Sequence, residues 1–237
     1  MTKITKSPLI IILIAINLTG CLKVLGPHDI PTTVTDIDGN TYNTVVIGTQ
    51  AWFKEDLKTT KYNDGTPIPH VTRNAEWETL TSGAYSYYNN SGSTIEYGAL
   101  YNWYTVDNNK ATRMASNGGK NICPVGWHVP SDDEWTTLAT YLGGKDIAGG
   151  KLKAEGTFYW AEPNKGATNE TGFTALPGGI RIHDGTFNSR RLAGIWWSTT
   201  EYSSTTALRK VIVNNYTYLG GHDNPKQVGL SIRCIKD

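Results

Sequence analysis

The three cysteines carry the most reactive side chains in this 237-residue sequence, and the first of them has a distinctive context. Cys21 closes the run Leu18-Thr19-Gly20-Cys21, which follows two lysines and a short apolar segment. That order is typical of a secretory signal peptide, and the run matches the bacterial lipobox, whose cysteine is lipidated and becomes the mature N-terminus. We therefore predict a signal peptide over 1–20 and a lipid anchor on Cys21. The alternative is an ordinary signal peptide followed by an unrelated cysteine.

Cys123 and Cys234 are the two cysteines that remain for the exported chain. Disulfides form and persist in the oxidising compartments that exported proteins enter, so the simplest expectation is one bridge between them. Leu230, Ile232 and Cys234 alternate onto one face of the last predicted strand, which points the second cysteine into the core. The alternative is a pair of free thiols.

A carboxylate and an amide lie close together in the triplet Glu162-Pro163-Asn164, and such oxygen ligands suit Ca²⁺. Aromatic residues precede this triplet, and exposed aromatic rings can stack on sugars or anchor protein partners. We predict a ligand site in this stretch, made of Tyr159, Trp160, Glu162, Asn164 and Asn169. Two alternatives stay open: Trp160 folds inward and fills the loop, and the two asparagines only cap turns.

Aromatic residues are abundant, with 8 Trp, 13 Tyr and 4 Phe in the chain. Four tryptophans lie in apolar patterns and are predicted to fill the core: Trp103, Trp127, Trp135 and Trp196. Six others lie in or near polar loops and are candidates for the surface: Tyr87, Tyr88, Tyr159, Trp160, Tyr216 and Tyr218.

The remaining polar residues form no recognisable catalytic or metal-binding pattern. The histidines lack metal-ligand spacing: His28, His70, His128, His183 and His222. Between Pro124 and Pro130, His128 fits a turn better than a general base. A Gly-rich phosphate loop and a nucleophile elbow are both missing from the sequence. We therefore predict no metal centre, and a protein that acts by binding or by structure rather than by catalysis.

The charge balance argues against a nucleic-acid partner. The chain has 22 basic and 21 acidic residues, and loss of Lys3 and Lys6 with the signal peptide leaves a net charge of −1. Nucleic acids and anionic membrane surfaces select proteins with a clear excess of basic residues. The length after the signal peptide suits one domain. We assign 21–32 to a lipidated tether and 33–237 to the domain.

One helix in this domain has clear start and stop signals. Ser131 is a natural N-cap, Glu134 completes a capping box, and Gly143-Gly144 provides the stop. A second helix is predicted over 99–106 from the spacing of its apolar residues. One or two helical turns are expected over 73–80, and 145–172 is predicted as a long, Gly-rich loop.

The rest of the domain reads as short β-strands. Residues 34–48 predict a hairpin across Asp38-Gly39-Asn40, with another strand from Gln50. A second hairpin is predicted over 179–188, across His183-Asp184-Gly185. The other strands are expected at 173–177, 194–199, 207–215 and 228–235.

Several longer motifs in the chain resemble the Fibrobacter succinogenes major paralogous domain. This resemblance covers nearly all of the chain after the signal peptide, and it implies an exported lipoprotein. The motifs are D-I-D-G-N-T-Y at 36–42, I-G-T-Q-A-W at 47–52, Y-G-A-L-Y-N-W-Y at 97–104, C-P-V-G-W-H-V-P-S-D-D-E-W at 123–135, G-F-T-A-L-P-G-G at 172–179, W-W-S-T-T-E at 196–201 and S-I-R-C-I-K-D at 231–237.

A more distant resemblance is to C-type-lectin-like domains, in particular the formylglycine-generating-enzyme type. It rests on V-P-S-D-D-E-W at 129–135, which stands where those domains begin a helix, and on G-L-S-I-R-C at 229–234, which resembles their closing strand. The resemblance implies an α+β fold in which two main helices flank twisted antiparallel sheets, with long irregular loops and paired termini. Cys123 and Cys234 match the bridge positions of that fold.

The same resemblance bears on calcium and on catalysis. Sugar-binding C-type lectins use a Glu-Pro-Asn triplet with a later Trp-Asn-Asp triplet, but Trp196-Trp197-Ser198 here offers no matching Asn-Asp. We predict no cofactor, with Ca²⁺ at Glu162 and Asn164 as the alternative. Formylglycine-generating oxidases bind copper through a nearby pair of free cysteines, which this chain lacks once Cys21 is lipidated. An enzyme of that type is therefore the disfavoured alternative.

These patterns together predict a lipid-anchored protein of the cell envelope, on the outer membrane or the cell surface. Its domain is expected to be non-catalytic and to bind a glycan or an envelope protein. Its membrane contact is predicted to run through the lipid anchor, and no nucleic-acid partner is expected.

Overall fold

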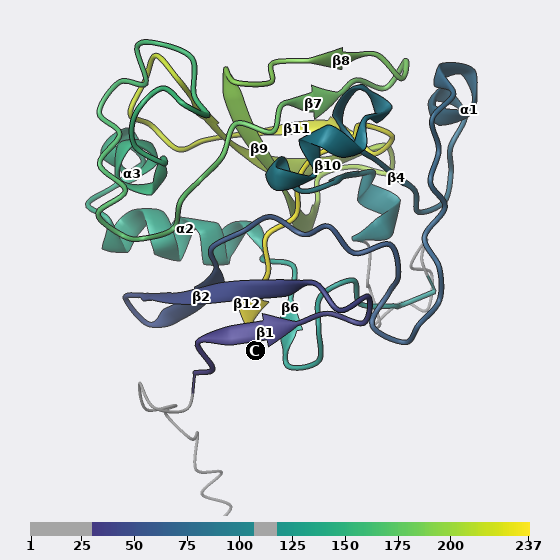
Figure 1. Ribbon diagram of the computed structural model, residues 1–237, viewed down its shortest axis with the longest axis horizontal. Coiled ribbons are helices and arrows are strands. Elements are labelled where there is room, and N and C mark those ends of the chain that lie inside the picture. The colour runs from purple at the N-terminus through teal and green to yellow at the C-terminus, as the bar shows by residue number, and fades with distance from the viewer. Residues whose placement is uncertain (1–29, 107–117) are drawn as a thin grey trace, which may run out of the picture.

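The computed structural model describes residues 30–106 and 118–237 (Figure 1). Cys21, the predicted signal peptide over 1–20 and most of the predicted tether over 21–32 lie outside these residues. Within the described residues the chain is a mixed α and β structure with mostly antiparallel sheets and few helices. None of the helices found in the described part of the chain is long and apolar enough to cross a membrane.

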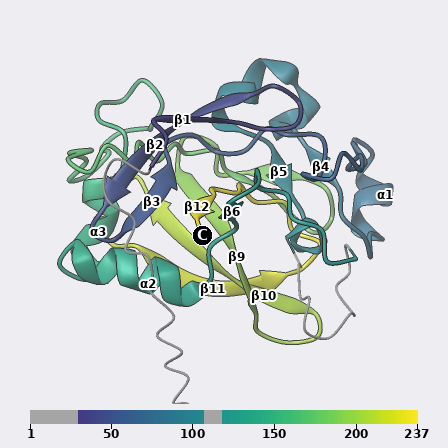
Figure 2. The same cartoon turned by 90° about the horizontal axis from the view of Figure 1, so that it is seen from below.

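A five-stranded antiparallel sheet forms one end of the molecule and brings the first described strands beside the last one (Figures 1 and 2). In spatial order its strands are β1 (Thr33–Thr35), β2 (Thr41–Ile47), β3 (Gln50–Phe53), β12 (Ile235–Lys236) and β6 (Trp127–His128). The predicted β1–β2 hairpin is confirmed, because the Asp36 carboxylate accepts from the backbone N–H groups of Asp38 and Asn40 and closes the turn. Ile235 pairs with Trp52 on one side and with His128 on the other.

Three smaller sheets make up the other end of the molecule. The strands of the largest are β9 (Ala193–Glu201), β10 (Thr206–Val213) and β11 (Gly220–Pro225), in the order β11-β10-β9. The two-stranded sheets are β4 (Tyr85–Ser86) with β5 (Leu100–Tyr101), and β7 (Ile180–Arg181) with β8 (Phe187–Asn188). The structure confirms the predicted strands at 194–199 and 207–215 and the predicted hairpin over 179–188. The sequence did not predict β11, which is Gly-rich and polar.

Two segments that were predicted as strands form mainly isolated β-bridges in the structure. At 173–177 only Ala175 pairs, with Lys153. At 228–235 a strand forms only as β12, and the preceding residues make one bridge each to three different sheets through Gly229, Leu230 and Ser231. This extended segment therefore ties the sheets together instead of lengthening one of them.

The predicted long helix is confirmed as α2 (Asp132–Tyr141). The Ser131 hydroxyl accepts from the backbone N–H of Glu134, whose side chain accepts from the Ser131 backbone N–H in return. Gly143 ends the helix with a φ of +95°, a conformation that residues with a Cβ rarely adopt. The turns expected over 73–80 form α1 (Asn74–Glu78).

The prediction of a helix over 99–106 is wrong. That stretch forms β5 and a 3-10 turn, η3 (Trp103–Thr105). Tyr101 donates its backbone N–H to Leu230, and the Asn102 side chain bonds to the backbone of Ala84 and Ser82. Long-range partners therefore outcompete the local i→i−4 bonds that the apolar spacing suggested. Two further 3-10 helices, η1 (Tyr88–Asn90) and η2 (Gly92–Tyr97), precede this stretch.

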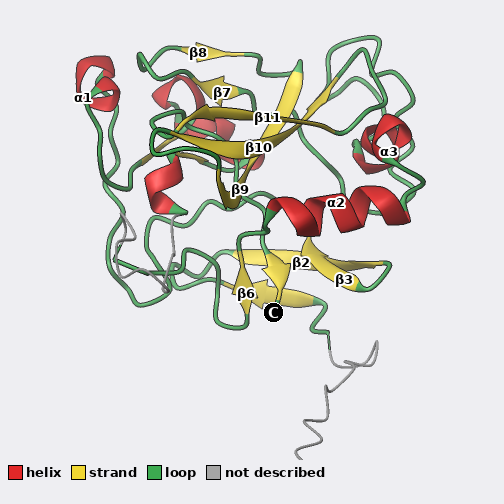
Figure 3. Cartoon of the chain, turned by 180° about the vertical axis from the view of Figure 1, so that it is seen from behind, coloured by secondary structure: helices red, strands yellow, loops and turns green. Residues whose placement is uncertain are grey.

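The loop predicted over 145–172 also needs correction, because it begins with a helix, α3 (Lys145–Leu152). Its Gly149 allows the backbone of Tyr218 to cross closely: a Cβ there would lie 2.3 Å from the Tyr218 carbonyl oxygen. α2 and α3 lie on the same side of the molecule, next to one another (Figures 1 and 3). The second main helix therefore lies beside α2 and not over 99–106, where the sequence predicted it.

The core confirms the predicted bridge and the predicted buried tryptophans. Cys123 and Cys234 form a disulfide with their Cα atoms 6.0 Å apart. All four tryptophans expected in the core are buried: Trp103, Trp127, Trp135 and Trp196. Arg233 and Asp56 form a buried ion pair. The indole of Trp196 donates to the same carboxylate oxygen of Asp56.

Candidate functional site

A continuous line of aromatic rings and arginines runs from the core to the surface at the end of the molecule that carries β7 and β8. Each member touches the next through a ring–ring or cation–π contact. We call this line the ladder. Its members, in order from the core, are Trp77, Arg181, Phe187, Tyr88, Arg190, Tyr97, Tyr159 and Phe158. The first three form the inner half, and the other five form the outer half.

The inner half is closed by backbone oxygens. The guanidinium carbon of Arg181 lies 4.1 Å from the ring centre of Trp77 and 5.0 Å from that of Phe187. Its Nε and both Nη atoms donate to three carbonyl oxygens, those of Gly185, Val71 and Thr72. Burial lowers the pKa of Arg181 to about 10, so the side chain stays charged near neutral pH. Each of the three nitrogen atoms of the buried cation therefore has an acceptor, as buried polar groups need.

The outer half is open. The guanidinium carbon of Arg190 lies 5.2 Å from the ring centre of Tyr88 and 5.9 Å from that of Tyr97. Tyr97 meets Tyr159 edge to face at 5.8 Å, and Tyr159 meets Phe158 edge to face at 4.8 Å. Tyr97 is only 7% exposed, whereas Phe158 at the end is 76% exposed. The line therefore rises from a buried tyrosine to a phenylalanine ring in solvent.

One tight turn and a glycine beneath it position the outer half. Ser189 and Arg191 flank Arg190 and adopt left-handed conformations, with φ of +64° and +67°. Such conformations cost about 1–2 kcal/mol for residues with a Cβ, and they persist where the surroundings fix them. Gly179 lies beneath the turn: a Cβ there would lie 2.7 Å from the Arg190 nitrogen and 2.9 Å from the Tyr88 ring. The glycine therefore lets the two segments meet.

Arg191 and Asn164 fix the loop that carries Phe158. Arg191 donates from its two Nη atoms to the carbonyl oxygens of Phe158 and Thr157, at 2.8 and 3.0 Å. At the base of the loop, the Asn164 amide donates to the carbonyl oxygens of Ala154 and Gly156, at 2.9 and 2.7 Å. A loop held at both points loses little conformational entropy when it binds a ligand.

The structure separates the predicted ligand residues into two groups. Trp160 is 0% exposed, and its indole donates to the carbonyl oxygen of Ala175. Asn164 is buried, and Asn169 bonds to the backbone and hydroxyl of Thr174, which it holds in a left-handed turn. Assigning Trp160 and Asn164 to ligand binding therefore needs correction, because both are buried and support the loop from within. Asn169 is half-buried, and its side chain holds the turn at Thr174. Tyr159 lies half-exposed in the ladder and Glu162 is exposed, so both stay candidates.

The two asparagines of the predicted site have their side chains inside the loop. Ca²⁺ takes six to eight oxygen ligands, and the Asn164 amide nitrogen donates to two carbonyl groups of its own loop, while its Oδ1 atom is buried without a partner. The side chain of Asn169 is likewise bonded to Thr174. Across residues 30–106 and 118–237, no group of three or more His, Cys, Asp or Glu side chains is placed to hold a metal ion.

Lys153 is buried beneath the same loop, and no pattern in the sequence marks it. Its ammonium donates to four carbonyl oxygens, those of Lys165, Val213, Asn214 and Tyr216. Burial lowers the pKa of Lys153 to about 8. The lysine joins the loop to the end of β10 and so gives the outer half of the ladder a fixed base.

Three of the other tyrosines predicted at the surface lie outside the ladder. Tyr216 is exposed and contacts Tyr218, with their ring centres 5.5 Å apart. Tyr87 is half-buried against His70 and Tyr85. Arg190, Arg191 and Tyr97 were missed as site residues, because the sequence has no signal that places the 189–191 turn against η2.

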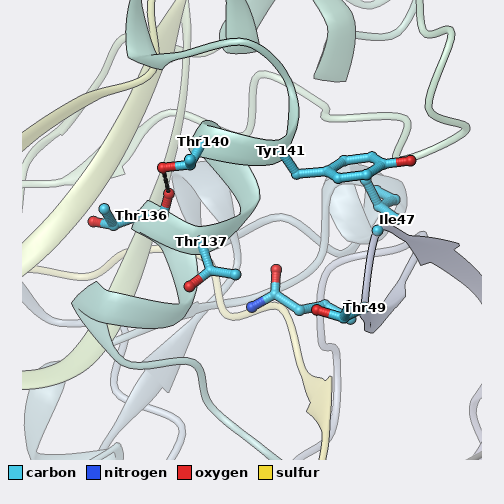
Figure 4. A pocket seen from close by; sticks show the side chains of 8 residues that line it. Ile47, Thr49, Thr136, Thr137, Thr140 and Tyr141 are labelled. Atoms are coloured by element: carbon cyan, nitrogen blue, oxygen red, sulfur yellow. Dashed lines mark hydrogen bonds between the residues drawn. The ribbon is translucent and has the colours of Figure 1, made fainter.

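A hollow lies between α2 and the β2–β3 turn, with a volume of about 580 Å³ (Figure 4). The ring of Tyr141 covers Gly48, whose missing Cβ leaves room for it. Three threonines of α2 line the hollow, but each donates its hydroxyl to a carbonyl of its own helix: Thr136, Thr137 and Thr140. The Gln50 Oε1 atom there is buried without a partner, and none of the residues that line the hollow carries a charge. The ladder is therefore the stronger candidate.

A histidine–carboxylate cluster lies at the opposite end of the molecule. His128 bonds through Nε2 to Glu134 at 2.8 Å and through Nδ1 to Asp237 at 2.7 Å. The bond with Glu134 raises the pKa of His128, burial opposes it, and Asp237 adds to the rise. Because both ring nitrogens are occupied, neither is available as a general base. The cluster clamps β6, α2 and the last residue of the chain together.

Comparison with known proteins gives one match. Residues 45–236 match the family model described as the Fibrobacter succinogenes major domain. Neither a curated protein nor a solved structure matches the chain.

Proposed function

This chain belongs to the Fibrobacter succinogenes major domain family, and from that premise we propose that it is the binding domain of an exported, lipid-anchored envelope protein. The domain is non-catalytic and holds a glycan on the outer half of the ladder. An envelope protein is the second candidate partner.

The exposed ring of Phe158 carries this proposal. Apolar side chains in solvent are informative where they adjoin one another, and Phe158 adjoins the half-exposed ring of Tyr159. Arg191 fixes the backbone of Phe158, and Tyr159 packs against its ring. A flat, rigid aromatic face with polar neighbours suits the apolar face of a sugar ring.

The arrangement of the two ends supports the lipid anchor. β7 and β8 lie at the end of the molecule far from β1, where the described chain begins (Figures 1 and 3). A lipid on Cys21 tethers the chain just before β1. The ladder then faces away from the membrane, toward ligands at the cell surface.

Two features support a C-type-lectin-like fold as the finer class. The strand at the end of the chain pairs between β3 and β6, and the bridge joins Cys123 to Cys234. The same bridge disfavours the enzyme alternative, because formylglycine-generating oxidases need free cysteines. The loop that carries the aromatic tip lies on a rigid scaffold, which is where binding residues usually reside.

The test is a glycan panel probed with the mature domain and two matched variants. Phe158→Ala removes the exposed ring of the ladder, and Val125→Ala removes an exposed apolar side chain outside it. We expect glycan binding that the first variant loses by tenfold or more and the second retains, with melting temperatures close to wild type for both. EDTA should leave binding unchanged. Equal binding by both variants, or no bound glycan, would overturn the proposal.

The anchor is tested separately. Mass spectrometry of the membrane-extracted protein should find two or three acyl chains on an N-terminal Cys21. A mature protein cut elsewhere and free of lipid would refute the anchor and leave the glycan test unaffected.

A further inference from the structure

Arg190 is the one strongly charged group in the outer half of the ladder, and its donors are free. Among the described residues its side chain forms no hydrogen bond and no ion pair. Arg181 and Arg233, which also stack on rings, donate instead to protein oxygens. An arginine carries five N–H donors in a rigid fork that matches the oxygens of a carboxylate, sulfate or phosphate.

Two aromatic rings lie beside the guanidinium of Arg190. Tyr88 and Tyr97 lie within 6 Å of the guanidinium carbon, and the left-handed turn of 189–191 holds the backbone. A flexible surface arginine loses much rotamer entropy on binding, whereas a stacked one has already lost part of it. The structure therefore presents a positioned cation, with its hydrogen-bonding capacity directed at solvent.

The local charge balance favours an anion. Burial raises the pKa of the Tyr97 hydroxyl, the charge of Glu96 adds to the rise, and the charges of Arg190 and Arg191 oppose it. All three ions thus act on the same ring. Around this hydroxyl two arginines thus outnumber one glutamate, whereas the chain as a whole is near neutral. A local excess of positive charge concentrates anionic ligands.

We propose that the ligand of the outer half is an acidic oligosaccharide. Its uncharged ring stacks on Phe158 and Tyr159, and its carboxylate, sulfate or phosphate accepts hydrogen bonds from Arg190. The contacts from Tyr159 to Tyr97 and from Tyr97 to Arg190 measure 5.8 and 5.9 Å. Tyr97 therefore connects the aromatic tip of the ladder to the cation. This inference rests on the proposed glycan-binding function and adds the class of the ligand.

The experiment compares charged and neutral ligands of the same shape. The probes are a galacturonic acid hexamer, a sulfated hexasaccharide of the heparin type and a hexose phosphate oligomer, with a carboxyl-reduced form of the first as its neutral counterpart. The full mature protein is tested as wild type, Arg190→Met and Arg190→Lys. Arg73→Met, which removes an exposed arginine outside the ladder, is the matched control.

At least one acidic probe should bind wild type tenfold or more tightly than the neutral counterpart does. Arg190→Met should lose that preference, because a charge-assisted pair of hydrogen bonds disappears. Arg190→Lys should retain part of it, and Arg73→Met all of it. Added salt should weaken acidic binding, since exposed charges are screened. The melting temperature of each variant shows that the domain is folded.

The outcomes separate this inference from the function it rests on. If neutral glycans bind through Phe158 and acidic ones bind no better, the glycan-binding function stands and the acidic ligand is refuted. If acidic binding depends on Arg190 but survives Phe158→Ala, the inference stands and the aromatic platform is refuted. Absence of binding to every glycan, or equal acidic affinity for wild type and Arg190→Met, overturns the inference.

Discussion

The two halves of the ladder contain the same types of residue in different roles. Arg181 and Arg190 each stack on two aromatic rings, yet only the first donates to backbone oxygens. The inner arginine is fully buried and bonds to two stretches of chain, one at Val71 and Thr72 and the other at Gly185. The outer arginine lies in solvent with free donors. Ring contact alone therefore does not tell a structural arginine from one that binds a ligand.

The difference lies in where the hydrogen bonds go. A buried donor without a partner costs about 1–3 kcal/mol, so the inner half must be satisfied internally. An exposed donor is satisfied by water, which a ligand can replace. The outer half therefore stays available without destabilising the fold, and its positions can change with little effect on stability.

The largest predicted effect concerns the disulfide, which lies outside the ladder. Replacing Cys123 and Cys234 with serine should lower the free energy of unfolding by up to about 4.7 kcal/mol, the chain-entropy figure for a loop near 100 residues. Urea unfolding followed by tryptophan fluorescence measures this. Binding at 10 °C, where the variant stays folded, should remain within twofold of wild type. A folded variant without binding would show that the outer half depends on the bridge.

The second prediction compares the two arginines directly. Arg181→Met should lower the free energy of unfolding by about 3 kcal/mol, because it leaves buried carbonyl oxygens without donors. Arg190→Met should change it by less than about 0.5 kcal/mol, as expected at an exposed site. Chemical denaturation of both variants under identical conditions provides the measurement. Similar losses for both would mean that the two halves do not differ as described.

The sequence predicted the elements whose signals are local. Ser131 and Glu134 formed the capping box that their spacing indicated, and Asp38-Gly39-Asn40 turned the first hairpin. The bridge of Cys123 to Cys234 followed from cysteine number and compartment. Each depends on residues close in sequence or on a count, which one sequence supplies.

The candidate site could not be predicted in the same way. The ladder joins residues from 77 to 190 through contacts between segments that have no shared pattern. Asn164 and Trp160 resembled ligand residues by type, yet the loop needed them inside, for a hydrogen bond to Gly156 and to Ala175 respectively. The helix expected over 99–106 failed for the same reason, because Leu230 offered Tyr101 a partner from far away. Long-range pairing decided all three.

The third prediction tests the point where the two halves meet. Gly179→Ala places a methyl group 2.6 Å from the Asn188 carbonyl oxygen and requires a φ of +75°. We expect a loss of about 1–2 kcal/mol in the free energy of unfolding, since the left-handed conformation alone costs that much. The 188–190 turn must also shift, so acidic-glycan binding should fall more than stability suggests. Gly39→Ala, with a similar φ and open space around it, is the control for strain without displacement.

The smallest effect is a pH dependence at the opposite end of the molecule. The pKa of His128 is raised above its usual value of about 6.5 by Glu134, with burial opposing and Asp237 adding. The protonated form is therefore favoured in the folded state. Its stabilisation is fully present below pH about 6.5 and is lost as pH rises through the raised pKa. The Glu134 pKa is lowered, chiefly through its bond with His128 against an opposing effect of burial, so this carboxylate stays ionised throughout.

Unfolding free energies measured from pH 6 to 9 should therefore decrease by up to about 1 kcal/mol, the usual limit for partly exposed ion pairs. The pKa of buried Lys153 is lowered to about 8, so its titration raises the free energy of unfolding as pH increases above that value. The comparison is therefore made between wild type and His128→Gln at each pH. The difference between the two proteins should shrink as pH rises. Acidic-glycan binding should stay constant from pH 6 to 8, because burial raises the pKa of Tyr97 and its hydroxyl keeps its proton over this range. Binding that follows the His128 titration would couple the clamp to the ladder and contradict their independence.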